Sequence, residues 1–238
     1  MERLQKVIAN RGYCSRRKAE ELILQKKVKV NNEVISELGV KIDENAIIEI
    51  EGQIIVKEQK EYILLNKPRG VVTTTKDDKH RKVVSDLIET DKRLYPVGRL
   101  DYDTTGALIL TNDGDLTNLL LHPKNEIDKV YIAKINGILT GKAIAILKSG
   151  VIIDGVKTSR AKVKVKRVDK KNKTTIVEIT IHEGKNHQIK KMFSAVGYEV
   201  LKLKREKIAF LDVTKLKFGE YRHLTIKEVK QLYNLSKN

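Results

Sequence analysis

The order of strand-like and helix-like stretches after residue 60 limits most strongly what this chain can fold into. Five stretches are rich in β-branched and apolar residues and read as strands: YILLN (62–66), GALILTN (106–112), KVYIAKING (129–137), KVKVKRV (162–168) and TTIVEITIH (174–182). Helical stretches follow at 114–121, 140–148, 186–196 and 225–235. Runs of strands broken by isolated helices predict an α+β fold with a mixed, mainly antiparallel sheet and flanking helices, not a doubly wound parallel sheet.

A different pattern precedes residue 60. Apolar residues at helical spacing predict two short helices near 4–8 and 19–23, and Ser15 is placed to cap the second through its hydroxyl. Asn31 and Asn32 suit a tight hairpin turn because asparagine tolerates positive φ. The stretch 40–56 alternates like half-buried strands. We therefore expect two domains, a small α/β module at 1–59 and a larger one at 60–238.

The charge of the chain favours a polyanionic partner. Lys and Arg number 48 against 31 Asp and Glu, a formal balance of +17, and each cation placed on a phosphate releases condensed counterions. Residues 1–29 hold nine cations and three acids, whereas 30–59 hold two cations and seven acids. Residues 157–173 hold nine cations and one acid in a pattern that alternates with valine, which predicts a strand with one cationic face. A merely solvated basic surface is the alternative.

Several classes of protein do not fit. The single cysteine, Cys14, allows no internal disulfide framework and no paired-cysteine metal site. No apolar stretch approaches the ~20 residues of a spanning helix, and MERLQKVIANRG lacks the apolar block of a signal peptide. We expect a cytoplasmic protein with no bound metal and no membrane contact.

Four short segments contain the residues that could carry chemistry. NKPRG (66–70) ends an apolar strand in a rigid turn. PVGRLDYDTTG (96–106) encloses an arginine and two carboxylates between two glycines eight apart. KVY (129–131) places an aromatic ring early in a strand, and EGKNHQIKKM (183–192) is a loop that opens a basic helix.

Taken singly, these residues have plainer interpretations. An aspartate such as Asp101 in a glycine-bounded loop commonly only forms a turn, and its neighbour Asp103 is expected to bond backbone amides. Tyr131 could be an ordinary strand aromatic, and Lys190 a solvated helix charge. His182 and His187 could suggest a metal site, but no third histidine or cysteine lies nearby.

Together, in order and spacing, the four segments resemble the motifs of the RsuA/RluB family of pseudouridine synthases. Residues 98–114, GRLDYDTTGALILTNDG, carry the most specific part of this resemblance. RLQKVIANRGYCSRRKAEELILQKKVKVNNEVI (3–35) resembles the S4-type RNA-binding domain, whose helix pair lies against structured RNA. HPKNEIDKVY (122–131) is more similar to the large-subunit RluB type than to the small-subunit RsuA type.

The resemblance implies roles for individual residues. Asp101 matches the catalytic carboxylate, Tyr131 the ring that packs against the target base, and Lys190 a basic partner of the carboxylate that is usually arginine. Lysine offers only a point charge where arginine could form a two-pronged clamp. Residues expected to contact RNA are Arg99, Arg3, Lys6, Arg11, Arg16, Arg17, Lys18, Lys67, Lys129, Asn186, His187 and Gln188.

The implied reaction agrees with these residue types. Pseudouridine formation breaks the N1–C1′ glycosidic bond, turns the uracil and rejoins it through C5, which requires a carboxylate near the sugar, as in glycosidases. It needs no cofactor. The implied substrate is one uridine of ribosomal RNA, most often 23S. The alternatives are the 16S enzyme of the same family, a non-catalytic S4-type ribosome binder, and an RNA nuclease using Asp101, Asp103 and a metal.

Overall fold

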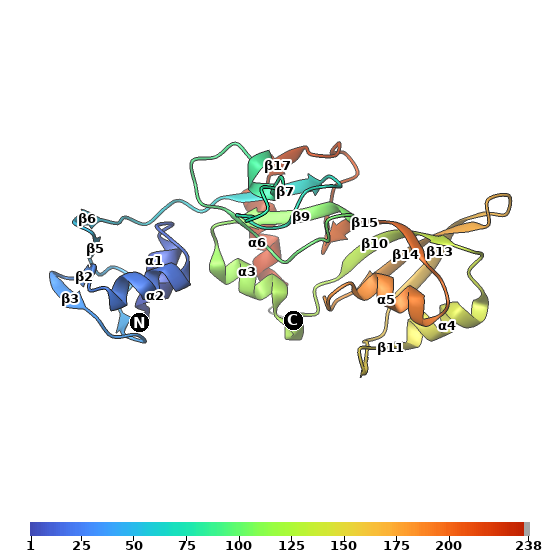
Figure 1. The fold of residues 1–238 in the computed structure, drawn as a ribbon, viewed down its shortest axis with the longest axis horizontal. Coiled ribbons are helices and arrows are strands. Elements are labelled where there is room, and N and C mark those ends of the chain that lie inside the picture. Colours follow the sequence, from blue (N-terminus) through green and yellow to red (C-terminus); the bar gives the residue numbers. More distant parts are fainter. Residues whose placement is uncertain (236–238) are drawn as a thin grey trace. The chain divides into compact units, whose positions relative to one another are not determined.

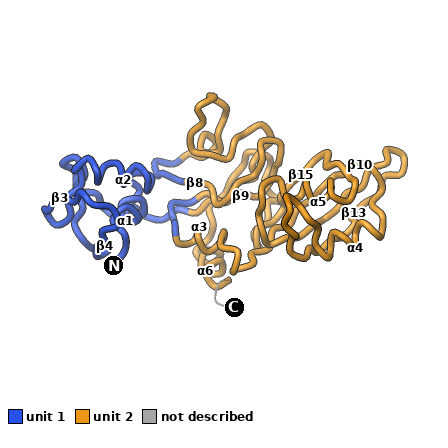
Figure 2. The backbone as a smooth tube through the Cα atoms, turned by 60° about the horizontal axis from the view of Figure 1, so that its bottom comes forward, with its two compact units in different colours: residues 1–61, 90–94, 111–114 blue, residues 62–89, 95–110, 115–238 orange. Residues whose placement is uncertain are grey.

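The structure is a computed structural model, and it describes residues 1–235. The chain forms two compact units (Figure 2). The first comprises Met1–Glu61, Thr90–Leu94 and Thr111–Gly114, and the second comprises Tyr62–Glu89, Tyr95–Leu110 and the chain from Asp115 onward. The functional domain boundary after residue 59 stays a prediction.

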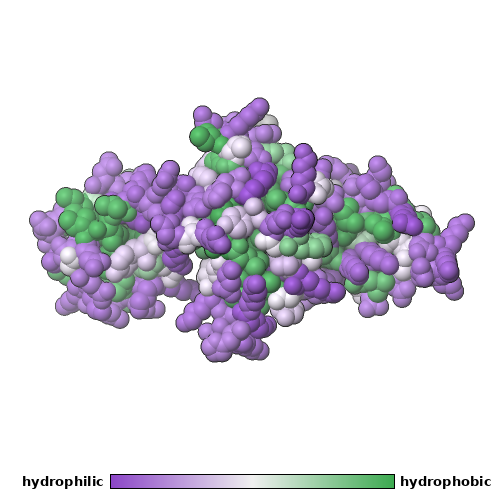
Figure 3. Space-filling model, turned by 90° about the horizontal axis from the view of Figure 1, so that it is seen from above, coloured by the Kyte–Doolittle hydropathy of each residue, from purple (hydrophilic) through white to green (hydrophobic). Residues whose placement is uncertain are grey.

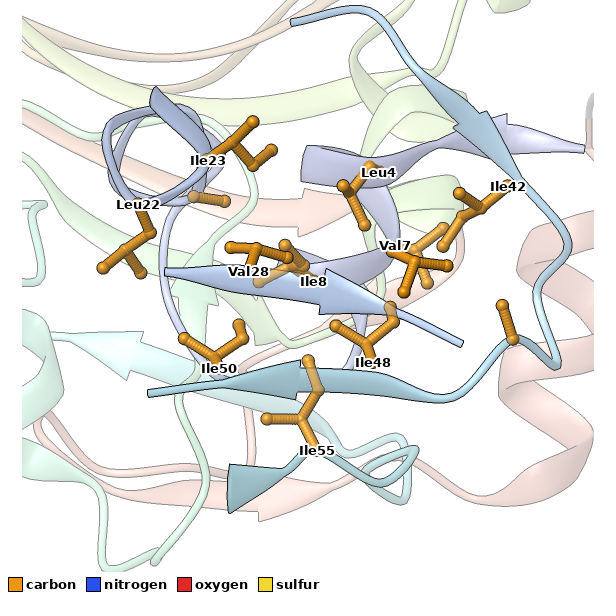
Figure 4. Packing of buried hydrophobic residues seen from close by; sticks show 13 residues of the cluster. Leu4, Val7, Ile8, Leu22, Ile23, Val28, Ile42, Ile48, Ile50 and Ile55 are labelled. Carbon is orange, nitrogen blue, oxygen red and sulfur yellow. The ribbon is translucent and has the colours of Figure 1, made fainter. Parts of the chain in front are cut away.

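The first unit packs two short helices on a small antiparallel sheet. Its elements are β1 (Glu2–Arg3), α1 (Leu4–Asn10), α2 (Arg16–Leu24), β2 (Val28–Val30), β3 (Glu33–Ile35), β4 (Lys41–Ile42), β5 (Ile48–Ile50) and β6 (Gln53–Ile54), with strand order β3-β2-β5-β6 and a separate β1-β4 pair. Figure 4 shows Leu4 and Ile8 of α1 pointing towards Val28 and Ile48 of the strands. These apolar side chains are fully buried, so the unit has its own core.

Local details of this unit follow the sequence. The Ser15 hydroxyl accepts a hydrogen bond from the Lys18 amide at 3.1 Å and so caps α2, as predicted. Asn31 and Asn32 form the two-residue turn between β2 and β3 with φ values of 50° and 72°. The predicted hairpin is therefore confirmed, and it uses the positive φ that asparagine tolerates.

The second unit is built on one large mixed sheet (Figure 1). Its strands are β7 (Tyr62–Lys67), β8 (Tyr95–Pro96), β9 (Thr105–Thr111), β10 (Lys129–Asn136), β13 (Lys162–Asp169), β14 (Thr174–Ile181), β15 (Val200–Ile208), β16 (Leu211–Asp212) and β17 (Tyr221–His223). The order is β13-β14-β10-β15-β9-β7-β17. Strands β13, β14, β10 and β15 pair antiparallel, whereas β15 and β9 run parallel. The expected α+β fold with a mixed sheet is confirmed.

The helices of this unit are close to those predicted. They are α3 (Gly114–Leu121), α4 (Gly141–Ser149), α5 (Gln188–Ala195) and α6 (Ile226–Asn234), with 3₁₀ turns η1 (Val84–Leu87) and η2 (Pro123–Asn125) and a small hairpin β11 (Ile152–Ile153) and β12 (Val156–Lys157). In Figure 1, α4 and α5 lie below strands β10, β13 and β14. Their face of the sheet is buried: Ala133 and Ile135 of β10 and Val177 and Ile179 of β14 are fully enclosed. The described residues contain no helix long and apolar enough to cross a membrane.

Strand β15 lies in the middle of the sheet and was missed by the sequence interpretation. It pairs with β10 on one side and β9 on the other. Between residues 202 and 207 the strand has five charged side chains and one apolar side chain, Leu203. Tertiary pairing, more than local propensity, makes this segment a strand.

Candidate active site

Asp101 lies in the loop between β8 and β9, and three neighbours hold the backbone of this loop. The Thr73 hydroxyl donates to the Leu100 carbonyl at 2.7 Å and accepts from the Leu100 amide at 3.2 Å. The Gly70 amide donates to the Tyr102 carbonyl at 2.9 Å. The NKPRG turn and the Asp101 loop are therefore parts of one structure, which explains why both segments stand out in the sequence.

Lys67 provides the third attachment. Its side chain is fully buried, and its ammonium group donates to the carbonyl oxygens of Pro68, Asp101 and Thr104 at 3.1, 3.1 and 3.0 Å. An ammonium group has three N–H donors, so each has a partner here. Burial lowers the pKa of Lys67 to about 8, against the opposing effect of the Asp101 and Asp103 charges.

The Asp101 carboxylate faces two basic side chains of the 183–192 segment. Its Oδ2 lies 3.4 Å from Nζ of Lys190, and its Oδ1 lies 3.5 Å from Nε2 of His187. The carboxylate side chain is 30% exposed, so it is accessible from solvent.

Lys190 is bound more closely to Asp103 than to Asp101. Its Nζ lies 2.7 and 2.9 Å from the two Asp103 oxygens. The hydrogen bond from Lys190 lowers the pKa of Asp103, with burial opposing it. Asp103 was expected to bond backbone amides. It bonds its own amide, but its main partner is Lys190, whose single point charge reaches both carboxylates and lies nearer Asp103.

A cleft of about 480 Å³ opens beside Asp101, within the ~300–1,000 Å³ usual for ligand sites. Tyr131 of β10 and Arg205 of β15, which are paired across the two strands, both line it. Tyr131 is 8% exposed. Strand β10 thus places an aromatic ring, and the Asp101 loop a carboxylate, on the wall of the same cleft.

Lys129 also lines this cleft, at the start of β10. Its Nζ donates to the Ile127 and His182 carbonyls at 3.2 and 2.8 Å. Burial lowers its pKa to about 8, and the positive charge of Arg205 adds to this effect. The amine is therefore held by the protein at the cleft wall.

Arg205 is a site residue that sequence reasoning missed. It is 4% exposed, its Nε donates to the Ala107 carbonyl at 2.7 Å, and its Nη2 is buried with no hydrogen-bond partner among the described residues. A buried guanidinium nitrogen with a free N–H beside a cleft can bind an anionic or carbonyl oxygen of a ligand. The only available signal was an arginine in an alternating segment that had not been interpreted as a strand.

Gly106 allows β9 to approach β15 at this site. It pairs with Arg205 in the parallel ladder and has a φ of 112°. A Cβ atom added here would lie 2.0 Å from the Arg205 carbonyl oxygen. The glycine at the end of the 98–106 segment is therefore required by a backbone contact directly under the cleft.

Two residues expected to contact RNA have buried side chains. Lys67 is fully buried with its three donors in use, as described above. Gln188 is 4% exposed; its amide donates to Glu183 at 2.6 Å and accepts from the Lys185 amide at 2.8 Å. The prediction for Lys67 is corrected, because its donors are used inside the protein. Gln188 is itself one of the residues that line the cleft, and its RNA contact stays a prediction.

In the first unit, Arg11 is also used internally. Its guanidinium donates to the backbone carbonyls of Ile55, Glu44 and Ala46 at 2.9, 2.8 and 2.7 Å. These bonds join the end of α1 to the loops around β5 and β6. Three N–H groups of the guanidinium thus have a structural role, and the expected RNA contact of Arg11, which is half-buried, stays a prediction.

The remaining predicted RNA contacts are on the surface or at the cleft. Arg99 is exposed and lines the cleft, Asn186 is exposed, and the His187 side chain is 52% exposed at the start of α5. Of the RNA contacts predicted in the first unit, Arg3, Arg16, Arg17 and Lys18 are exposed, while Lys6 is half-buried and pairs with Glu2. Lys18 pairs with Glu21 at 2.9 Å. Among residues 1–235 no group of three or more His, Cys, Asp or Glu side chains is arranged to hold a metal ion.

Comparison with known proteins assigns the chain to a family. The sequence profile described as RNA pseudouridylate synthase matches residues 61–195, and the S4 domain profile matches residues 2–48. The chain belongs to the RNA pseudouridylate synthase family and carries an N-terminal S4 domain. The resemblance stated from the sequence is confirmed.

Relatives and a solved structure match over nearly the full chain. Ribosomal large subunit pseudouridine synthase B of Bacillus subtilis is 52% identical over 99% of this chain and 97% of that relative. The dual-specificity RNA pseudouridine synthase RluF of Escherichia coli is 36% identical over 99% of this chain and 80% of its own length. A crystal structure of a pseudouridylate synthase superposes with a TM-score of 0.68 at 31% identity, covering 98% of this chain and all of that one.

Proposed function

We propose that this enzyme converts one specific uridine of ribosomal RNA to pseudouridine, in the 23S RNA of the large subunit, with Asp101 as the catalytic carboxylate. The single observation that carries the proposal is the accessible Asp101 carboxylate beside Tyr131 in a cleft of a pseudouridine synthase fold. The name of the Bacillus subtilis relative, a large-subunit synthase, supports the choice of 23S over 16S RNA.

In the proposed reaction, Asp101 acts at the sugar. A carboxylate there can remove a proton or trap the sugar while the N1–C1′ bond is broken and the uracil turns. Lys190 and His187 lie 3.4 and 3.5 Å from the carboxylate oxygens and are placed to orient the carboxylate in the cleft. The Tyr131 ring packs against the uracil.

The target uridine has to leave its stack to reach this cleft. Arg99, exposed at the rim, is placed to fill the gap or hold a phosphate. The buried Nη2 of Arg205 adds a donor for an oxygen of the nucleotide. These assignments put the base contacts on β10 and β15 and the backbone contacts on the loops.

The S4 domain supplies a separate contact with RNA. We propose that residues 1–59 act as an RNA-binding domain and 60–238 as the catalytic domain, with Arg3, Arg16, Arg17 and Lys18 on phosphates. An rRNA substrate places the protein in the cytoplasm. A non-catalytic ribosome binder would explain the charge of +17 but not the carboxylate beside Tyr131.

Replacing Asp101 with asparagine tests the proposal. Asp101→Asn keeps the shape but removes the charge, so kcat for pseudouridine formation should fall to background while RNA affinity changes only a few-fold. Asp103→Asn is the matched control and should cost much less. Appreciable turnover by folded Asp101→Asn protein would refute the assignment. RNA strand cleavage that needs added metal would instead favour the nuclease alternative.

A further inference from the structure

In the β13–β14–β10 part of the large sheet, the face opposite α4 and α5 is more exposed than the face that these helices cover. On the covered face, side chains of β10 and β14 such as Ala133 and Val177 are fully buried. On the opposite face, alternate side chains of the same two strands, such as Ile132 and Ile176, are half-exposed. Because successive side chains of a strand point to opposite faces, this difference marks an open sheet face behind the cleft.

Cations dominate this open face. Strand register places Lys202 of β15 opposite Lys134 of β10, Lys134 opposite Ile176 of β14, and Ile176 opposite Arg167 of β13. The next row contains Lys164, opposite Glu178. Lys134, Lys164, Arg167 and Lys202 form what is here called the back-face cluster. In Figure 3, seen from above, hydrophilic side chains surround small apolar areas on this part of the protein.

A β-bulge adds one of these charges. The register of β13 against β14 shifts between Val165 and Arg167. Lys164 pairs with Glu178 and Arg167 with Ile176, two residues apart on β14, so Lys164 and Arg167 share a face although they are three residues apart. In a regular strand Arg167 would point to the covered face. The bulge therefore turns its guanidinium onto the open face.

Glu178, the acid opposite Lys164 of the cluster, is paired with Lys166 instead. Other cations of this face have acidic partners: Lys162 pairs with Asp128 at 3.0 Å and Lys166 with Glu178 at 3.2 Å. Within residues 1–235, none of the four cluster residues forms a salt bridge, although the charge of Arg167 contributes to lowering the pKa of Asp169. Lys134 and Lys202 face each other directly, and like charges in that position destabilise a sheet.

We propose that the back-face cluster binds the phosphate backbone of a second segment of the ribosomal RNA, separate from the one that presents the uridine to the cleft. This rests on the proposed rRNA substrate. The row from Lys202 to Arg167 crosses three strand spacings, about 14 Å, and so can reach several phosphates. Backbone contacts of this kind position an RNA without reading its sequence. Bound phosphates would also relieve the repulsion between Lys134 and Lys202.

The test compares two charge-matched variants on refolded 23S rRNA domains. The cluster variant is K134Q/K164Q/R167Q/K202Q. The control variant is K142Q/K148Q/K227Q/K230Q, which removes four exposed cations of α4 and α6. Affinity is measured across a salt series for the rRNA domain and for the isolated hairpin that carries the modified uridine.

The cluster variant should bind the rRNA domain about tenfold more weakly, and its log–log salt slope should be shallower by about 3.6, since each of the four duplex phosphate contacts contributes about 0.9. Its affinity for the hairpin should stay within about twofold. The control variant should lose less than about threefold on either RNA. The melting temperature of the cluster variant should equal or exceed that of the native protein, because a like-charge pair is removed.

Three results would overturn this proposal. The first is an equal loss of rRNA affinity in both variants, and the second is an unchanged rRNA affinity in the cluster variant. The third is a cluster variant that binds polyglutamate, used as a second probe, more weakly but RNA as well as the native protein does, which would indicate an acidic protein partner. If the native protein formed no pseudouridine in any of the rRNA domains, the proposed function would be refuted instead. The two failures are distinguishable because binding is measured independently of turnover.

Discussion

Replacing Lys67 with methionine should lower the activity of the enzyme far more than its stability. The buried ammonium donates to three carbonyls, one of which is the Asp101 carbonyl. Methionine keeps the length and apolar stem but leaves these carbonyls without their donor, at about 1 kcal/mol each. Removing a buried charge offsets part of this loss, so we expect a net destabilisation of about 2 kcal/mol, or roughly 6 °C in melting temperature.

The loss of activity should be much larger than the loss of stability suggests. Without Lys67, the backbone around Asp101 keeps its bonds to Thr73 and Gly70 and the bond from the Thr104 amide to the Asp101 carbonyl, but it loses the side chain that joins Pro68, Asp101 and Thr104. A shift of about 1 Å in a catalytic group costs on the order of 100-fold, so kcat should fall at least that far. Pseudouridine formation under saturating RNA and thermal unfolding of the same sample give both quantities.

Lys129→Met is the control for this prediction. Lys129 is also a partly buried lysine at the cleft, bonded to two backbone carbonyls, but it makes no bond to the Asp101 loop. We expect a similar fall in melting temperature and a loss in kcat of less than about tenfold. If Lys67→Met retained native kcat, or if the two variants lost kcat equally, the positioning role of Lys67 would be refuted.

Three further outcomes are expected. Gly106→Ala should lower the melting temperature by about 10 °C and reduce kcat, because its Cβ would meet the backbone of β15 at 2.0 Å; a native-like variant would contradict this. In the native enzyme kcat should fall as pH rises above about 8, because burial lowers the pKa of Lys67 to about 8 and the neutral amine has too few N–H groups for three carbonyls. The Lys129→Gln variant should show the same fall, and a kcat that stays constant up to pH ~10 would refute this explanation. The double variant Arg16→Gln, Arg17→Gln should raise KM far more than it lowers kcat. In titrations against rRNA, its salt slope of binding should be shallower by about 2, and an unchanged slope would mean that α2 does not contact phosphates.

The sequence predicted what is local in the fold. Helix α3 follows the predicted 114–121 stretch, and Ser15, Asn31 and Asn32 take the conformations that their side-chain chemistry favours. These features depend on neighbouring residues and on hydrophobic periodicity. Strand β15 was missed because its Lys-rich sequence does not look like a strand. It becomes one by pairing with β9 on one edge and β10 on the other, and the local sequence gives no sign of these partners.

The same limit applies to the candidate site. Motif spacing drew attention to Asp101, Tyr131 and Lys190, and the structure brings Asp101 and Tyr131 to one cleft. The direction of each polar side chain could not be predicted. Lys67 and Gln188 point inward to satisfy buried carbonyl and amide groups, and such bonds depend on segments distant in sequence.

Mapping pseudouridine in ribosomal RNA tests the central claim most directly. Cells lacking this protein would be compared with cells that regain either the native chain or the Asp101→Asn variant. We predict that one uridine of 23S RNA is unmodified without the protein, modified again with the native chain, and still unmodified with Asp101→Asn. An unchanged pseudouridine pattern in cells lacking the protein, or full restoration by Asp101→Asn, would contradict the account.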